Sequence, residues 1–194
     1  MDTLKTITEK TEQGIRLSPD DGLALMGCRD ILSLGKLAAA VKQRKTGNHV
    51  FFNVNCHINL TNVCVSRCAF CAFSRDAGDA DAYVMSSGDV LEKVRAALPA
   101  GVTEVHMVSG LHPDKPFPYY CDILRVLKKE FPALHIKAFT PVEIKYFADI
   151  AGMSIRDVLL QLQEAGLQSL PGGGAEVLSD RVREQLCPKK ATAR

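Results

Sequence analysis

Three cysteines, Cys64, Cys68 and Cys71, stand close together in one short string of the sequence. Their spacing, C-x3-C-x2-C, allows three thiolates to wrap around one metal centre, and thiolates hold both iron–sulfur clusters and zinc. A four-iron cluster held by only three cysteines leaves one iron open to a small molecule. We therefore expect a [4Fe–4S] cluster at this string, with chemistry on a ligand of its open iron.

Two other interpretations of the string stay open. A structural zinc site takes Cys56 or His57 as its fourth ligand, and a closed four-cysteine cluster takes Cys56. Residues 52–60 alternate with period two, which places Cys56 on the apolar side with Ile58 and weakens both interpretations. The alternative that remains is a zinc-stabilised binding module without catalysis.

Strands and helices that alternate along the chain must position this string. The pattern predicts, in order, a strand at 52–60, a loop to 82, a helix at 86–98, a strand at 103–108, a helix at 116–131, a strand at 134–139, helices at 142–148 and 154–165, and the start of a strand at 167–170. Two helices, at 18–27 and 29–44, come first. We expect an α/β fold with a parallel sheet and two leading helices, divided into a helical segment at 1–48 and a main domain at 49–194.

Composition excludes several classes of protein. The chain has 194 residues, of which 46% are hydrophobic and 24% charged, as in ordinary globular proteins. A net charge of +2 gives no basic excess for nucleic acid. The longest uncharged stretch, 47–66, contains several Asn and His residues, so we expect no membrane segment. Seven cysteines, three of them clustered, favour a reducing compartment, and we predict a cytoplasmic location.

The cysteine string resembles the signature of the radical S-adenosylmethionine (SAM) superfamily, C-x3-C-x-aromatic-C, with Phe70 at the aromatic position. The resemblance implies a partial TIM-type (β/α) barrel with the cluster at the carboxyl ends of its strands. It also implies two cofactors, a [4Fe–4S] cluster with one open iron and SAM. A reducing partner such as flavodoxin or ferredoxin supplies the electron.

Four further strings narrow the resemblance. Residues 59–64, 109–114, 137–140 and 171–176 look like a subgroup that holds the menaquinone enzymes of the futalosine route and a deazaflavin enzyme. Within it the chain is most similar to the aminofutalosine synthase family. That likeness implies a transferase that joins the 5′-deoxyadenosyl group of SAM to 3-[(1-carboxyvinyl)oxy]benzoate with loss of CO2. The sister enzymes, dehypoxanthine futalosine cyclase and the deazaflavin-type synthase, are the alternatives; the cyclase typically has Asn in place of His112.

Polar residues on three predicted strands share one parity. His57, His106 and Lys137 are expected to face the barrel interior, because the helices outside require apolar residues on the other face. The implied substrate carries carboxylates, and an imidazolium or ammonium is a suitable partner for them. We predict that these three residues bind substrate; no catalytic side chain is assigned beyond the cluster.

Other residues are implied to bind the cofactors. The family holds the amino group of SAM with backbone groups where Ser109 and Gly110 stand, although the subgroup usually has Gly at position 109. Gly173 offers a close backbone approach, and Glu176 an acceptor for ribose hydroxyls. Phe70 completes the set of predicted cofactor-binding residues.

The length is small for such a barrel. A full eight-unit barrel needs about 250 residues, and only about four βα units can be counted in 194 residues. We therefore expect a truncated barrel with little turnover on its own.

Overall fold

The computed structural model describes residues 3–174 and 176–192 and divides into two compact units, Met1–Phe52 and Asn53–Arg194. Each unit is described by itself. No helix in the described ranges is long and apolar enough to cross a membrane.

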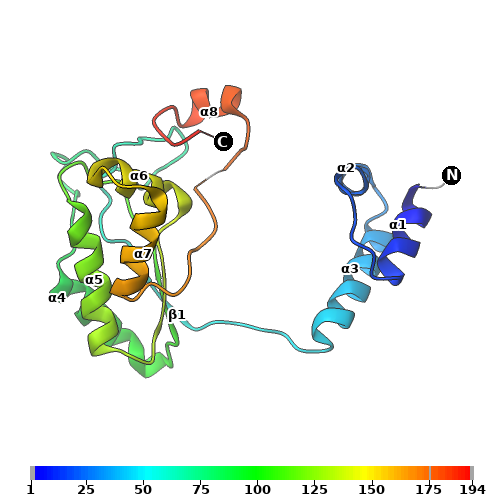
Figure 1. Cartoon of the computed structure of the whole chain (residues 1–194), viewed down its shortest axis with the longest axis horizontal. Coiled ribbons are helices and arrows are strands. Elements are labelled where there is room, and N and C mark those ends of the chain that lie inside the picture. Colours follow the sequence, from blue (N-terminus) through cyan, green and yellow to red (C-terminus); the bar gives the residue numbers. More distant parts are fainter. Residues whose placement is uncertain (1–2, 175, 193–194) are drawn as a thin grey trace. The chain divides into compact units, whose positions relative to one another are not determined.

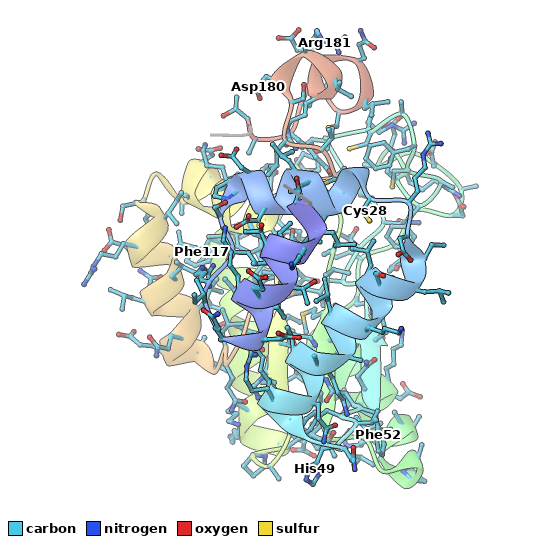
Figure 2. All side chains as sticks on the ribbon, turned by 90° about the vertical axis from the view of Figure 1, so that its right-hand side faces the viewer. Cys28, His49, Phe52, Phe117, Asp180 and Arg181 are labelled. Carbon is cyan, nitrogen blue, oxygen red and sulfur yellow. The ribbon has the colours of Figure 1, made fainter. Side chains whose placement is uncertain are left out.

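The first unit consists of three helices, α1 (Thr3–Glu12), α2 (Pro19–Gly27) and α3 (Ile31–Thr46). The sequence analysis predicted α2 and α3 but missed α1, whose buried side is only Ile7 and Thr11, one turn apart. The predicted helix start at Ser18 is confirmed by a capping box. Large apolar side chains remain exposed in this unit, such as Phe52 at 85%, labelled in Figure 2.

The second unit is built on a parallel sheet in the order β1 (Asn55–Ile58), β2 (Glu104–Met107) and β3 (His135–Ala138). These strands are shorter than the predicted ones. Where the sequence predicted a fourth strand, Ser169 forms a single parallel bridge to Lys137. The α/β fold with a partial parallel sheet is therefore confirmed.

Helices α4 to α7 lie next to the sheet in Figure 1 and share its hydrophobic core. The helices of this unit, with the short 3-10 turn η1, are α4 (Ser87–Ala97), η1 (Leu98–Ala100), α5 (Phe117–Glu130), α6 (Pro141–Ala151), α7 (Ile155–Ala165) and α8 (Asp180–Leu186). Ser86 and Thr140 begin α4 and α6 with capping boxes. The sequence analysis did not predict α8.

One face of the sheet forms the core with these helices. Cys56, Ile58, Met107, Ile136 and Ala138 are buried there, while the residues between them on β1 and β3 keep solvent access. The period-two prediction is therefore confirmed for β1 and β3, whereas in β2 Glu104 is buried as well as Val105 and Met107.

The alternation ends just after β3. Phe139 has a φ of 63°, which is rare for a bulky side chain, and its ring lies fully buried edge-to-face against Tyr120 and Phe147. This turn carries the chain from β3 into the cap residue of α6, so that Thr140 reaches the end of the sheet.

Candidate functional site

A cavity of about 230 Å³ lies at the carboxyl ends of the strands. Its walls come from the segments that follow β1, β2 and β3 and from the glycine-rich segment near residue 174. Of the predicted site residues, Cys64, Cys68, Phe70, Cys71, Ser109, Gly110 and Glu176 line it. Ligands of parallel α/β folds bind at this end of the strands, so the location suits a binding site.

The three motif cysteines share this cavity as free thiols. Cys68 is buried, which raises the pKa of its thiol, whereas Cys71 is exposed. Within residues 3–174 and 176–192, no group of three or more His, Cys, Asp or Glu side chains is gathered closely enough to hold a metal ion. Three thiols on one cavity are a donor set that fits an iron–sulfur cluster in its chemistry. Binding of a cluster requires the loop to bring these thiols closer together.

Backbone hydrogen bonds fasten the loop that carries the cysteines. The Cys64 N–H donates to the Arg75 carbonyl at 3.1 Å, and the Val65 N–H donates to the Leu111 carbonyl at 3.0 Å. On the far side of the motif, the Ala69 N–H donates to the carbonyl of Leu186 in α8 at 2.8 Å. The loop is thus held by the end of β2 and by α8, which are distant in sequence.

Ser109 and Gly110 form the wall that follows β2. The Ser109 Oγ accepts the Thr61 N–H at 3.1 Å, so its hydroxyl is bonded to the loop. A Cβ atom on Gly110 would lie 2.4 Å from the carbonyl oxygen of Val63. The glycine is therefore required by the close approach of the loop backbone, a reason that the sequence analysis did not foresee.

Glu143 is a buried residue of the same cavity wall and joins two elements. Its Oε1 accepts the Ser109 N–H at 2.9 Å, and its Oε2 accepts the Thr140 N–H and hydroxyl, both at 2.7 Å. Burial raises the pKa of this carboxyl to about 7. Glu143 thereby fixes the end of β2 to the start of α6.

Phe70 and Glu176 both lie close to the side chain of Lys190. The Lys190 Nζ lies 2.7 Å from Glu176 Oε1 and 5.5 Å from the centre of the Phe70 ring. Lys190 also lines the cavity. The segment that carries Lys190 therefore folds back onto the cavity. Gly173, with a φ of 114°, stands next to the lining residue Gly174.

The three predicted substrate-binding residues lie outside this cavity, on the other face of the sheet from the helices. His57 and His106 are paired in the strand register, and their rings lie 5.5 Å apart. His106 is paired in turn with Lys137 on β3. Burial, followed by the charge of Lys137, lowers the pKa of His106. The structure therefore brings the three residues together in one row.

Glu104 belongs to this face and was missed by the sequence analysis. Its Oε1 lies 2.6 Å from Lys137 Nζ in an ion pair without an aligned hydrogen bond, and its Oε2 accepts from Asn53 Nδ2 at 3.3 Å. Glu104 precedes His106 by two residues, so Lys137 points toward the amino ends of the strands. Glu104 and His106 are two residues apart on one strand, so their side chains lie on the same face of the sheet, and this alternation could have identified Glu104 from the sequence.

Comparisons with known proteins agree with this architecture. The family model described as the Radical SAM superfamily matches residues 58–194. The chain is 44% identical to aminodeoxyfutalosine synthase of Streptomyces coelicolor and 41% identical to that of Thermus thermophilus, over 94% and 96% of its length. It is also 42% identical, over 97% of its length, to 5-amino-6-(D-ribitylamino)uracil--L-tyrosine 4-hydroxyphenyl transferase of Methanopyrus kandleri. The chain spans about half the length of these relatives, 47%, 50% and 52%.

Two solved structures share the fold. The maturase HydG of the [FeFe]-hydrogenase aligns with 96% of this chain and 40% of its own length, with a TM-score of 0.75 and 16% identity. Methylornithine synthase (PylB) aligns with 95% of this chain and 51% of its own length, with a TM-score of 0.68 and 21% identity. At these identities the likeness concerns the fold alone.

Proposed function

The chain belongs to the radical SAM superfamily, whose members use a [4Fe–4S] cluster and SAM, and we propose on this premise that it is the cluster-bearing part of an aminofutalosine (aminodeoxyfutalosine) synthase. The reaction proposed is transfer of the 5′-deoxyadenosyl group of SAM to 3-[(1-carboxyvinyl)oxy]benzoate with loss of CO2, in menaquinone biosynthesis. The observation that carries the cluster site is that three free thiols line one cavity at the carboxyl ends of the strands, and the 44% identity to aminodeoxyfutalosine synthase of Streptomyces coelicolor supports the choice of reaction.

Cys64, Cys68 and Cys71 are the proposed cluster ligands. When bound, the cluster supplies the electron for reductive cleavage of SAM. The protein contributes a cavity whose walls are fixed by main-chain hydrogen bonds from Val65 and Ala69. These hydrogen bonds hold the backbone around the loop, and a held wall orients a bound ligand, which is a main contribution of a protein to cofactor chemistry.

The proposed SAM contacts are the backbone of Ser109 and Gly110, the Phe70 ring, Gly173 and Glu176. The Ser109 hydroxyl is bonded to the Thr61 N–H, which supports a role for the backbone rather than the side chain. Glu176 is paired with Lys190, so ribose hydroxyls must share or replace this ion pair.

Substrate binding is proposed at His57, His106 and Lys137. The paired register of the three residues supports a common site for an anionic substrate. Because Glu104 already neutralises Lys137, we propose that the two imidazoles make the direct contacts with carboxylates. The proposal also includes an external reductant such as flavodoxin or ferredoxin and a cytoplasmic location. It divides the chain into a helical segment at 1–48 and a barrel part at 49–194.

Metal content tests the assignment of the cluster. The chain and the variants Cys64→Ala, Cys68→Ala and Cys71→Ala are reconstituted anaerobically, with Cys28→Ala in the first unit as the matched control. We expect about four irons and four sulfides in the chain and in the control, and a large loss in the other three variants. A colourless chain that contains zinc and no iron would leave the structural zinc site as the correct interpretation.

Product analysis tests the reaction and separates it from a second candidate. The 42% identity to the 4-hydroxyphenyl transferase of Methanopyrus kandleri favours that transferase as the alternative. Reconstituted protein is given SAM, dithionite and the enol ether, or tyrosine with 5-amino-6-(D-ribitylamino)uracil. Aminofutalosine in the first mixture supports the proposal, whereas a new product only in the second supports the alternative. Release of deoxyadenosine alone in both mixtures points to another radical SAM reaction.

A further inference from the structure

The hydroxyl of Ser66 is buried without a hydrogen-bond partner. Ser66 is only 2% exposed, and its Oγ finds no partner within the part of the chain that the structure describes. Buried polar groups in folded proteins are nearly always hydrogen-bonded, so each exception needs a cause. A hydroxyl that is free in the protein alone is well suited to a partner that binds later.

Ser66 stands between two proposed cluster ligands and faces the same cavity. It lies two residues from Cys64 and two from Cys68, and it lines the cavity together with all three motif cysteines. The neighbouring Val65 N–H is held by the Leu111 carbonyl at 3.0 Å, which fixes the backbone beside it. The side chain is therefore held at the cavity by the fold.

Two other hydroxyls of the cavity wall show the contrast. Ser109 Oγ accepts the Thr61 N–H at 3.1 Å, and the Thr140 hydroxyl donates to Glu143 at 2.7 Å. Both have their partners within the protein and serve to hold the wall. Among the described residues, the Ser66 hydroxyl has no such partner, so no hydrogen bond with them explains its burial.

We propose that the Ser66 hydroxyl donates a hydrogen bond to a sulfur atom of the bound iron–sulfur cluster and raises its reduction potential. The inference rests on the proposed cluster at Cys64, Cys68 and Cys71. Hydrogen bonds to the sulfurs are one of the means by which proteins set cluster potentials. Because reduction adds negative charge to the cluster, the donor stabilises the reduced form more than the oxidised form.

Redox titration of the reconstituted chain, without SAM, tests this role. The reduced cluster is followed by electron paramagnetic resonance in the chain and in Ser66→Ala, with Ser74→Ala as the control, since Ser74 lines the same cavity. We expect equal iron content in all three. We expect the ratio of reduced to oxidised cluster in Ser66→Ala to fall about tenfold at a fixed potential, a shift of about 59 mV for one electron, and Ser74→Ala to behave as the chain.

The outcomes separate this inference from the proposed function. A chain that takes up no iron overturns both, whereas a loaded Ser66→Ala with the midpoint of the chain overturns only the hydrogen bond. If Ser66→Ala binds no iron, the midpoint potential of Ser66→Thr is measured instead, because this variant keeps a hydroxyl. A midpoint for Ser66→Thr within error of the midpoint of the chain then supports the inference. A midpoint lowered by about 59 mV, which lowers the ratio of reduced to oxidised cluster about tenfold, overturns it.

Discussion

Replacement of Gly110 by Ala is expected to disturb the cysteine loop through a direct clash of main-chain atoms. The new Cβ lies 2.4 Å from the Val63 carbonyl oxygen and 3.1 Å from that of Thr61. Ordinary carbon–oxygen contacts are roughly 3.3–3.6 Å, so the two backbones must separate by about 1 Å. The Gly110 N–H also donates to the Thr61 carbonyl at 2.9 Å, and separation strains this bond.

The expected loss of stability follows from these contacts. Overpacking costs about 1–3 kcal/mol, and a weakened hydrogen bond costs about 1 kcal/mol. Gly110 does not have a positive φ, so alanine also stabilises by about 0.5–1 kcal/mol through the unfolded chain. The net loss is about 2 kcal/mol, which lowers Tm by about 4–8 °C for a chain of this size.

Thermal unfolding and iron content measure this effect. The control is Gly78→Ala in the same loop, because Gly78 has no positive φ and a Cβ there meets no atom within 4 Å. We expect Gly110→Ala to have a lower Tm and to take up less iron, because the loop that moves carries Cys64. If Gly110→Ala matches Gly78→Ala in both measurements, the close approach at Val63 does not constrain the loop and the reasoning is refuted.

Three further predictions concern the charged groups. Because burial raises the pKa of Glu143 from 4.5 to about 7, the protonated carboxyl stabilises the fold at low pH, and about 3 kcal/mol of this stabilisation is lost as pH rises through about 7. Glu143→Gln should reduce the difference in the free energy of unfolding between pH 5 and pH 8, measured with urea. An unchanged difference contradicts the prediction. Glu104→Gln leaves the partly buried Lys137 ammonium without its carboxylate and should lower the free energy of unfolding by about 1–3 kcal/mol. Adding Lys137→Met to the same chain should recover part of this loss. If the losses of the two single variants simply add in the double variant, the two residues are not coupled. Lys137→Met alone leaves the Glu104 carboxylate without its cation on the same face as the two imidazoles, so it should weaken binding of the anionic substrate about tenfold, a loss of about 1.4 kcal/mol. Calorimetry with the reconstituted protein measures this, and an unchanged Kd removes Lys137 from the substrate site.

Much of the fold was readable because its signals are local. The capping boxes at Ser18, Ser86 and Thr140 depend on side chains three residues apart. The buried face of β1 and β3 follows from alternation along each strand. The prediction of a fourth strand was less successful. The segment near Ser169 has suitable residues, yet among the described residues it forms one isolated bridge, to Lys137.

Spacing and parity are properties of neighbouring residues, so they were enough to predict a thiolate metal centre at the three clustered cysteines and a shared face for His57 and His106. Only the tertiary structure decided that Glu104 neutralises Lys137, that Lys190 returns to the cavity and that Gly110 passes beneath the Val63 carbonyl. These contacts join residues that are 14 to 120 positions apart in the sequence, and they depend on strand register and on the path of the loops. No local pattern encodes such distances, because they are set by the packing of the whole unit.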